Sequence, residues 1–416
     1  MKILHINYHQ NQGGASVSVN RLIQALIKNK IYSKLLVNKK IKRNNFIIEQ
    51  FNKSSDQYIH KIKKLMAIYL KKILGAENCY KDSISIFPSK LYIKINKIEA
   101  DIINLHWICN EMISIEEIQK IKKPIVWTIV DMWPFSGSTH YTKNNFYKSR
   151  NKIFDKNKMF NIQNWVLKRK IKNFSNKIVI VCISNWLSKL AKKSCVFRNN
   201  KIVTIPCTID TNFWKKLNKK KAKKALGFEE RKKYFLFSSF NGINDKRKGF
   251  DLMLKALSKI KLDSKRFVIV VLGDSHNLEK INYSEKFNFR VFNERFDNKK
   301  DLLKKIYSAC DLLIMPSRIE AFGQVALEAG SCSLPTISFK NTGVEDIVDH
   351  KKNGYLAKYL NIKDLAKGVD MLSRPRNNTF MSKNIRTKVC KNFSYKIISK
   401  KYKEIYEKIS QNQKRY

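Results

Sequence analysis

Short apolar segments alternate with amphipathic segments along the whole chain, and this alternation restricts the fold more than any other feature. The first apolar segment is MKILHIN (1–7), which is followed by a Gly-Gly turn and by 15–30, whose apolar residues share one helical face. Short runs that are apolar throughout are typical of parallel strands buried on both faces. Strands that alternate with helices predict an α/β protein with doubly wound parallel sheets.

The alternation forms two series, which predicts two domains. Strands are expected at 1–7, 32–38, 101–107, 124–130, 177–184 and 201–206, and then at 233–240, 267–274, 289–293, 311–317 and 335–339. With 416 residues the chain is long enough for two full cores. We predict one domain over 1–206 and another over 207–392, with a hinge near Pro206–Trp214. Apolar residues at helical spacing in 393–416 predict a terminal helix that packs on a domain surface.

The cysteines and the N-terminal segment predict a cytoplasmic protein. The eight cysteines are scattered, and no two of them have the spacing of a metal-binding pair. Reduced cysteines in apolar surroundings are typical of a reducing compartment. The first residues lack the apolar core and cleavage site of a signal peptide, and no run of about 18 apolar residues predicts a membrane span.

The chain is strongly basic, with 84 Lys and Arg against 33 Asp and Glu and a net charge of +51. Two interpretations stay open. The charge can serve an anionic partner, or it can follow from AT-biased codon usage, since Ile, Lys and Asn abound and the lysines are spread everywhere. A nucleic-acid-binding protein is not expected, because the sequence has no helix-turn-helix, zinc-finger or aromatic-platform signature.

The segment 58–74, YIHKIKKLMAIYLKKIL, predicts a basic amphipathic helix. Its apolar stripe consists of Ile59, Ile62, Leu65, Met66, Tyr69, Ile73 and Leu74, and its other side carries Lys61, Lys63, Lys64, Lys71 and Lys72. Two interpretations stay open here as well. Such a helix can lie in an anionic membrane interface, or it can pack on the first domain and leave its lysines in water.

The segment PSRIEAFGQVALEAGSCSLP (316–335) contains two acids, Glu320 and Glu328, separated by seven residues. An expected strand leads into the first acid, and Gly323 opens a helix that carries the second, about 7.5 Å along the axis. Parallel sheets bind ligands at the carboxyl ends of their strands. A helix N-terminus also favours phosphate or sugar oxygens. The two acids therefore predict a nucleotide site, and the alternative is two surface acids beside an ordinary helix.

With these motifs the chain resembles the family-4 glycosyltransferases of the GT-B fold. The resemblance rests on 12–26, 105–108, 184–194, 205–214, 244–257, 316–348 and the FSY tail, and WTIVDMWPFSG (127–137) resembles the subgroup that builds cell-surface polysaccharides such as lipopolysaccharide. It implies two Rossmann-like domains that face across a cleft, an N-terminal acceptor domain and a C-terminal donor domain, with the terminal helix crossing back to the first domain.

The resemblance also implies the reaction. It is a retaining transfer of a sugar from a nucleotide diphosphate sugar to a glycan or lipid-linked acceptor, and it needs no catalytic metal and no other cofactor. The diphosphate leaves with negative charge, which cations and backbone N–H groups must stabilise. Lys248 matches the family's phosphate-binding lysine, and Arg247 is adjacent. By the same resemblance Glu320 binds hydroxyls of the transferred sugar and Glu328 binds the ribose hydroxyls.

Backbone groups complete the site that the resemblance implies. The N–H groups of Phe322, Gly323 and Gln324 are expected beside the sugar and phosphates. Gly13 and Gly14, directly after the first strand, would let that loop approach the diphosphate without a Cβ clash.

Some positions depart from the family pattern. Gly242 stands where an arginine is common, and Val130 stands where a histidine usually faces the donor sugar. His106 and His140 are candidates to compensate, and Asp131 is the better candidate for contact with the acceptor. We take Glu320, Asp131 and His106 as the catalytic candidates. A GT-B protein that binds a nucleotide sugar but has impaired turnover is the alternative to an active enzyme.

Overall fold

The computed structural model describes residues 1–41, 45–51, 53–76, 82–142, 161–239, 242–273, 278, 286–293 and 299–413. Outside these residues lie Cys79, the last residues of two expected strands, Phe240 and Asp274, and the end of the tail, 414–416.

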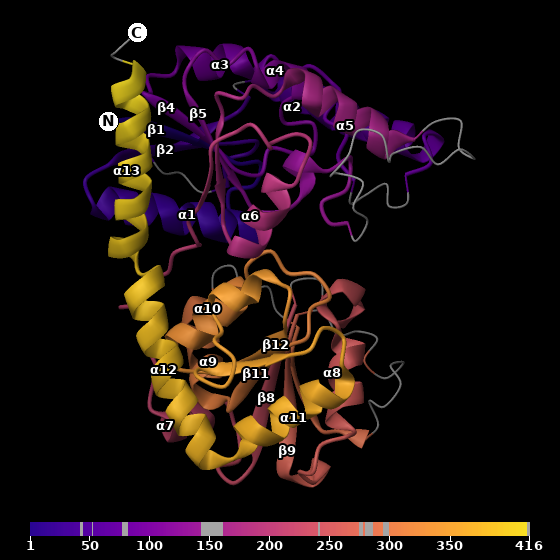
Figure 1. The fold of residues 1–416 in the computed structure, drawn as a ribbon, viewed down its shortest axis with the longest axis vertical. Helices are drawn as coiled ribbons and strands as arrows, with labels where there is room; N and C mark the ends of the chain where they lie inside the picture. The colour runs from indigo at the N-terminus through magenta and orange to yellow at the C-terminus, as the bar shows by residue number, and fades with distance from the viewer. Residues whose placement is uncertain are drawn as a thin grey trace. The chain divides into compact units, whose positions relative to one another are not determined.

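The chain forms two compact units (Figure 1). The first comprises Met1–Pro206 together with Ile398–Tyr416, and the second comprises Cys207–Ile397. Each unit has one sheet in which every neighbouring pair of strands is parallel, and helices flank it. The predicted fold class, α/β with two Rossmann-like domains, is confirmed.

The first unit contains a seven-stranded sheet with the order β3-β2-β1-β4-β5-β6-β7. The strands are β1 (Lys2–Ile6), β2 (Tyr32–Val37), β3 (Ile47–Glu49), β4 (Ile102–Leu105), β5 (Ile125–Ile129), β6 (Val179–Cys182) and β7 (Ile202–Thr204). The order reverses between β1 and β4, so the loops that follow these two strands diverge and leave a crevice at the carboxyl end of the sheet.

Helices of the first unit cover this sheet. They are α1 (Gly13–Lys28), α2 (Ser54–Ile73), α3 (Leu91–Lys97), α4 (Ile115–Ile118), η1 (Trp133–Phe135), α5 (Ile162–Asn173) and α6 (Asn185–Lys192). Most of the apolar face predicted for α1 is buried, including Leu22 and Leu26, whereas Ile27 is exposed.

The terminal helix α13 (Tyr395–Gln413) completes the first unit. Ile398, Tyr402 and Tyr406 enter the same apolar cluster as residues of β1, β4 and β5. Two polar contacts fix the register of the helix. The Tyr406 hydroxyl lies 2.6 Å from the Asn104 amide, and the Tyr402 hydroxyl lies 3.2 Å from Thr128 Oγ1.

The second unit contains a six-stranded sheet with the order β10-β9-β8-β11-β12-β13. The strands are β8 (Lys233–Ser238), β9 (Phe267–Leu272), β10 (Phe289–Phe292), β11 (Leu312–Met315), β12 (Thr336–Phe339) and β13 (Gly354–Ala357). The order reverses between β8 and β11, which places a second crevice at their carboxyl ends.

The helices of the second unit are α7 (Lys219–Ala225), η3 (Gly242–Asn244), η4 (Lys246–Lys248), α8 (Phe250–Leu257), η5 (Ser264–Arg266), α9 (Lys300–Ala309), α10 (Gln324–Ser331), η8 (Gly343–Asp346), α11 (Ile362–Ser373) and α12 (Pro375–Phe393). Among the described residues of both units, no helix is long and apolar enough to span a membrane.

Helix α10 ends in a left-handed turn at a serine. Ser333 has φ 62°. Its N–H donates to the carbonyl of Gly330, and the N–H of Leu334 donates to the carbonyl of Ala329. These two bonds define a Schellman motif, in which glycine usually occupies the left-handed position because a Cβ there is strained.

We predict that Ser333→Gly raises the free energy of unfolding by about 0.5–1 kcal/mol, because glycine adopts this φ without the Cβ strain. Chemical denaturation at neutral pH measures the change. The matched control is Ser331→Gly, which removes a buried hydroxyl that donates to the Trp214 carbonyl and should destabilise the protein. Equal or lower stability of Ser333→Gly would contradict the prediction.

Candidate functional site

The loop between β11 and α10 buries both acids of the 316–335 segment. Glu320 lies in the loop, and Glu328 lies in the second turn of α10, which begins after Gly323. Each residue is only 8% exposed. Ionisable side chains are rarely buried without a partner, so these are not ordinary surface acids, and their contacts show how they are held.

Glu320 forms an ion pair with Lys248. The Lys248 Nζ lies 2.6 Å from Glu320 Oε2, and the Ser317 hydroxyl donates to the same oxygen over 3.4 Å. Burial raises the pKa of Glu320, but the charges of Lys248 and Arg247 outweigh it, so this pKa lies below the ordinary value. Glu320 is therefore a carboxylate at neutral pH.

The turn that carries Lys248 packs closely on the Glu320 loop. Gly249, with φ 74°, follows Lys248, and a Cβ on it would lie 2.2 Å from the Pro316 carbonyl oxygen. The N–H of Arg318 donates to the Arg247 carbonyl over 2.8 Å. The position after Lys248 therefore requires glycine, because any side chain would push the two loops apart.

A third loop supports Glu320 from the end of β12. The N–H of Gly343 donates to the Glu320 carbonyl over 2.7 Å. A Cβ on Gly343 would lie 2.0 Å from the Ala321 carbonyl oxygen. Loops from the carboxyl ends of β8, β11 and β12 thus meet around Glu320 at the crevice of the second sheet.

Glu328 has a partner from a different helix. The hydroxyl of Tyr307, on α9, donates to Glu328 Oε2 over 2.7 Å. Between the two acids, the Phe322 side chain is buried and contacts Phe393 with ring centroids 5.9 Å apart. Only the backbone of Phe322 can therefore meet a ligand. The N–H groups of Phe322 and Gly323 donate to no other described residue, and Gln324 begins α10.

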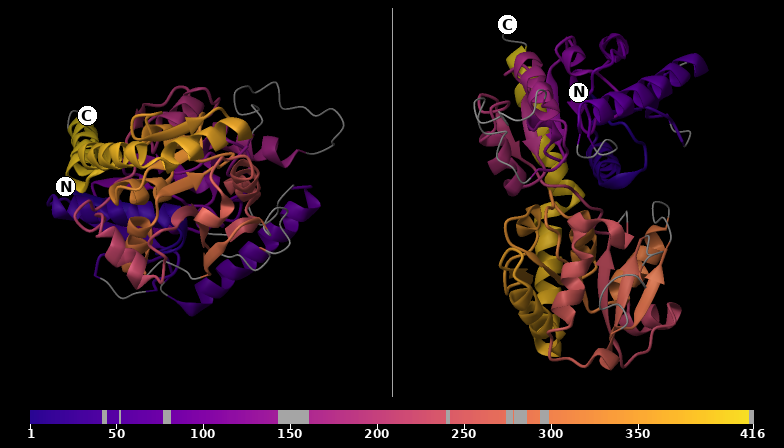
Figure 2. Two further views of the ribbon diagram at one scale, coloured as in Figure 1. Left: turned by 90° about the horizontal axis from the view of Figure 1, so that it is seen from below. Right: turned by 90° about the vertical axis from the view of Figure 1, so that its right-hand side faces the viewer.

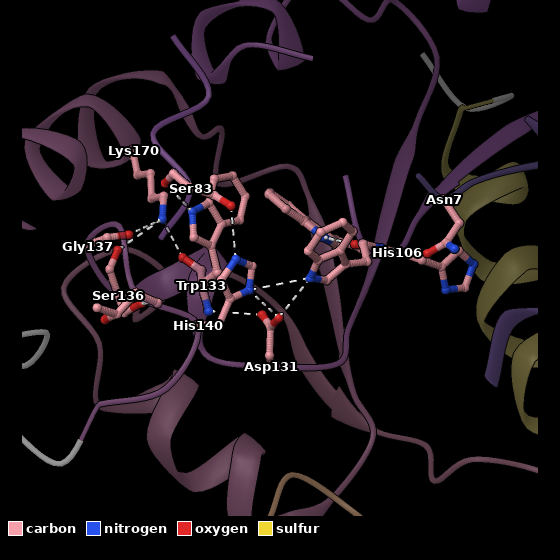
Figure 3. Close-up of polar contacts among 12 residues, drawn as sticks. Asn7, Ser83, His106, Asp131, Trp133, Ser136, Gly137, His140 and Lys170 are labelled. Carbon is pink, nitrogen blue, oxygen red and sulfur yellow. Dashed lines mark hydrogen bonds and ion pairs between the residues drawn. The ribbon is translucent and has the colours of Figure 1, made fainter. Parts of the chain in front are cut away.

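In the first unit Asp131 is the centre of a polar network at the carboxyl ends of β4 and β5 (Figure 3). Its Oδ1 accepts from the Trp133 N–H over 3.0 Å. Its Oδ2 lies 2.6 Å from His140 Nδ1 and accepts from the Trp107 indole over 3.1 Å. The Ser83 hydroxyl lies 3.0 Å from His140 Nε2. Asp131 and Ser83 therefore fix the His140 ring at both of its nitrogens.

Aromatic rings stack beside this network. Trp107 is stacked on His140 with centroids 5.5 Å apart and on His9 with centroids 5.9 Å apart. Trp133 is also stacked on His140, with ring centroids 6.4 Å apart. His9, Trp107 and His140 are half-buried. The crevice of the first sheet thus presents a carboxylate and a set of polar rings, which are groups that can bind hydroxyls of a sugar.

The buried Lys170 holds the turn that carries this network (Figure 3). Its Nζ donates to the carbonyls of Trp133, Ser136 and Gly137, and it lies 3.8 Å from the Trp133 ring centroid. Burial holds the pKa of Lys170 well below its ordinary value. Three carbonyls match the three donors of an ammonium group, so the contacts offset part of this desolvation.

The structure does not bring His106 together with Asp131. His106 is buried and its Nε2 lies 3.0 Å from Nδ1 of His5 on β1. In Figure 3 it lies near Asn7 and apart from the Asp131 carboxylate. Burial lowers the pKa of His5 to about 3, and burial together with His5 holds the pKa of His106 well below its ordinary value. His140 is the histidine that contacts Asp131. Val130, which directly precedes Asp131 in the sequence, is half-buried.

Gly13 and Gly14 open α1 beside the crevice of the first sheet. Gly13 has φ 78°, and among the described residues no atom beyond the chain neighbours and the helix's own backbone lies within 4 Å of a Cβ built on either glycine. Asn7 orders the preceding loop. Its amide donates to the His9 carbonyl over 2.7 Å and to Ser16 Oγ over 3.1 Å. The loop is therefore fixed, while a Cβ on either glycine would meet no described residue beyond its chain neighbours and its own helix.

Sequence reasoning missed several residues of the first-unit network. Ser83 and Lys170 contact it from segments far from Asp131 in the chain, and His9 and Asn7 come from the loop after β1. Lys170 stands within VLKRKIKN, where one buried lysine has the same sequence signal as its exposed neighbours. No motif in the sequence marks these residues.

Comparison with known proteins finds a family match within the second unit. Residues 218–388 match the family model of glycosyl transferases group 1. This range contains Arg247, Lys248, Glu320 and Glu328. An uncharacterized glycosyltransferase of Methanocaldococcus jannaschii is 29% identical over 188 residues, which are 44% of this chain and 47% of the relative. The chain thus spans about half the length of the curated relatives it matches.

Solved structures match the whole chain. Sucrose-phosphate synthase from Thermosynechococcus elongatus has a TM-score of 0.70 at 16% identity and covers 98% of both chains. Anabaena HepE in complex with UDP and glucose has a TM-score of 0.63 at 14% identity, covering 98% of this chain and 100% of HepE. The fold is GT-B. Each likeness at such low identity shows the fold alone.

We predict that acid weakens the first unit through its buried histidines. The unfolded chain protonates His5 below about pH 6.5, whereas folded His5 has a pKa of about 3. Between these values the unfolded state binds more protons. Above about pH 6.5, His5 is neutral in both states and costs no stability. As the pH falls below this value, the free energy of unfolding decreases by about 1.4 kcal/mol per pH unit because of His5.

Urea unfolding at pH 7.5, 6.5 and 5.5 measures this slope. His5→Gln keeps a polar partner for His106 but removes one titrating group, so its stability should fall less steeply with acid. The same slope in the wild type and in His5→Gln would contradict the assignment.

Proposed function

We propose that this protein is a retaining glycosyltransferase that transfers a sugar from a nucleotide diphosphate sugar to a glycan or lipid-linked acceptor. The observation that carries the proposal is the ion pair of half-buried Lys248 with buried Glu320, with buried Glu328 on the following helix. All three lie at the crevice of the second sheet and within the range that matches the family model.

The Lys248–Glu320 contact suits a nucleotide sugar, because in such a donor the phosphates adjoin the sugar. Lys248 and Arg247 can bind phosphate oxygens and stabilise the charge of the leaving diphosphate. Glu320 can then accept hydrogen bonds from the sugar hydroxyls. The N–H groups of Phe322 and Gly323, at the start of α10, donate to no described residue and can add donors beside the phosphates.

Glu328 is suited to the ribose of the donor. It is an acceptor on the second turn of α10, and the Tyr307 hydroxyl fixes one of its oxygens at 2.7 Å. A carboxylate that is held in this way can accept from two adjacent hydroxyls. Anabaena HepE, which has the same fold, was solved with UDP and glucose, so UDP-sugars are the first donors to test.

The first unit supplies the side chains that bind the acceptor substrate. Asp131 and His140, 2.6 Å apart, form a carboxylate–imidazole pair that can bind a hydroxyl. In the transfer step the anomeric carbon–phosphate oxygen bond breaks, and the acceptor oxygen bonds to the same face of that carbon. The proton of the acceptor hydroxyl passes to the departing phosphate. Because the new bond forms on the face that the phosphate leaves, the configuration of the anomeric carbon is retained.

The site also motivates a second candidate function, a GT-B protein that binds a nucleotide sugar without turnover. Gly242 has φ 66°, a conformation that an arginine adopts only with strain, so Arg247 must substitute for the second cation. Binding of a nucleotide sugar with no transfer to any acceptor would support this alternative.

We further propose a hexosyltransferase that acts in cell-surface polysaccharide synthesis, such as that of lipopolysaccharide, in the cytoplasm and peripherally at the inner face of the membrane. The motif 127–137, the scattered cysteines and the net charge of +51 support this placement. Nucleic acid is not proposed as a partner.

We predict that Lys248→Met weakens UDP binding about ten- to a hundredfold, because a charge-assisted hydrogen bond contributes about 1.5–3 kcal/mol. Isothermal calorimetry measures the affinity. The matched control is Lys246→Met, which removes the same charge from an exposed side chain two residues earlier and should change the affinity by less than about twofold. Equal effects of the two variants would contradict the assigned role of Lys248.

The transfer itself is tested with a panel of UDP-, GDP- and dTDP-sugars, followed by mass spectrometry of the product. Replacement of Glu320 and Glu328 together by alanine should abolish turnover. If turnover survives in the double variant, these acids do not form the donor site.

We predict that turnover needs no divalent metal, because Lys248 and Arg247 supply the positive charge for the leaving group. Among the described residues, no three His, Cys, Asp or Glu side chains gather closely enough to hold a metal ion. Excess EDTA should change the rate by less than about twofold, since no metal charge is removed from the transition state. A larger loss that Mg²⁺ or Mn²⁺ restores would refute the prediction.

A further inference from the structure

Helix α2 (Ser54–Ile73) turns its apolar side to solvent. Its exposed large side chains are Tyr58, Ile59, Ile62, Leu65, Met66, Tyr69 and Ile73, which we call the apolar row. Tyr58, Leu65 and Tyr69 are each 66% exposed. The apolar stripe of a surface helix in a soluble protein normally faces the core, so α2 has the reverse orientation.

The side of α2 that faces the protein is polar. Lys71 is buried and donates to the Asp82 carbonyl over 2.7 Å, and Lys64 donates to the Tyr8 hydroxyl over 3.1 Å. Gln57 donates to Glu49 over 3.1 Å. The buried residues of the helix are His60, Ala67 and Lys71. These contacts fix the helix about its axis, and they hold the apolar row outward.

The apolar row is long and continuous. From Tyr58 to Ile73 it extends about 22 Å along the helix, at about 1.5 Å per residue. In Figure 2 the helix lies at the outer edge of the first unit, and Gln57 contacts Glu49 of the edge strand β3. Contiguous exposed apolar surface of this kind marks an interaction site.

We propose that the apolar row docks the protein on an anionic membrane surface, with α2 lying in the plane of the interface. Exposed Lys61 and Lys72 lie near the two ends of the row and can reach lipid phosphates. Tyr58 and Tyr69 suit the headgroup region, where a ring can be half in water. The net charge of +51 favours an anionic surface over an apolar protein groove.

The position of α2 also indicates the class of acceptor substrate. This inference rests on the proposed function. Tyr8, which contacts Lys64, follows β1 and packs on Trp107 with ring centroids 5.9 Å apart. Trp107 donates to Asp131. Contacts through Tyr8 and Trp107 therefore connect the protein-facing side of the docked helix to the Asp131 network, which fits an acceptor anchored in the membrane by a lipid.

Vesicle co-sedimentation tests the docking without any need for activity. We compare wild type with Leu65→Ser/Tyr69→Ser on phosphatidylglycerol–phosphatidylcholine vesicles. The loss of two exposed apolar groups should weaken binding about tenfold or more. The control, Phe380→Ser, removes a side chain that is 58% exposed on α12 and should bind like wild type. None of these changes alters the charge. Wild-type binding by the double variant would overturn the proposal.

A charge-reversal pair separates docking by α2 from general attraction. Lys61→Glu/Lys72→Glu should release the protein from these vesicles more than Lys221→Glu/Lys224→Glu, an equal change at exposed positions of α7. Equal release by both pairs would mean that bulk charge alone binds the membrane. If wild type forms dimers that Leu65→Ser/Tyr69→Ser abolishes, without loss of vesicle binding, the apolar row is a protein interface and the proposal is wrong.

The acceptor step has its own readout. Leu65→Ser/Tyr69→Ser should retain wild-type hydrolysis of the donor in solution and lose transfer to a lipid-linked acceptor embedded in vesicles. Equal loss of both activities would overturn the acceptor step. If wild type shows neither activity with any donor, the proposed function fails, while the vesicle-binding result stands by itself.

Discussion

The ion pair between half-buried Lys248 and buried Glu320 is the contact on which the second unit's site depends. Two charges withdrawn from water are costly, so they are retained only where the surroundings hold them in good geometry. Gly249 and Gly343 provide that geometry, because a Cβ on either would collide with the loop that carries Glu320. The backbone at these glycines therefore sets the site as much as the charged side chains do.

The first unit also holds a buried carboxylate in place, that of Asp131, but with different partners. Asp131 is surrounded by N–H donors and by His140, and the turn beside it is held by a buried lysine through three carbonyls. Both units place their polar groups at the reversal of strand order, where diverging loops leave room in a parallel sheet. The common architecture explains why each crevice collects polar groups from segments far apart in sequence.

The strands and the second-unit acids were predictable from sequence, because fully buried strands are apolar throughout and the 316–335 segment is local. The short β3 and β13 were missed, since IIE and GYLA are too short and too mixed to give a period. Asp131 and His140 were named from the sequence, but their contacts with Ser83 and with the turn held by Lys170 were not readable, because these segments meet only after folding. For α2, the spacing of apolar residues in the sequence revealed an apolar stripe but not whether it faces the core or the solvent. That orientation depends on the hydrogen bonds that Lys64 and Lys71 form with the rest of the first unit.

The terminal helix has a consequence for biogenesis. Tyr402 and Tyr406 lie in the core of the first unit and contact Thr128 and Asn104, which are 274 and 302 positions earlier in the chain. During translation the N-terminal sheet emerges long before α13 exists, so its apolar surface stays uncovered until α13 has been made. The second unit, whose residues are contiguous from 207 to 397, can fold first. A ribosome that stalls before α13 emerges would thus leave an N-terminal unit exposed to chaperones and proteases.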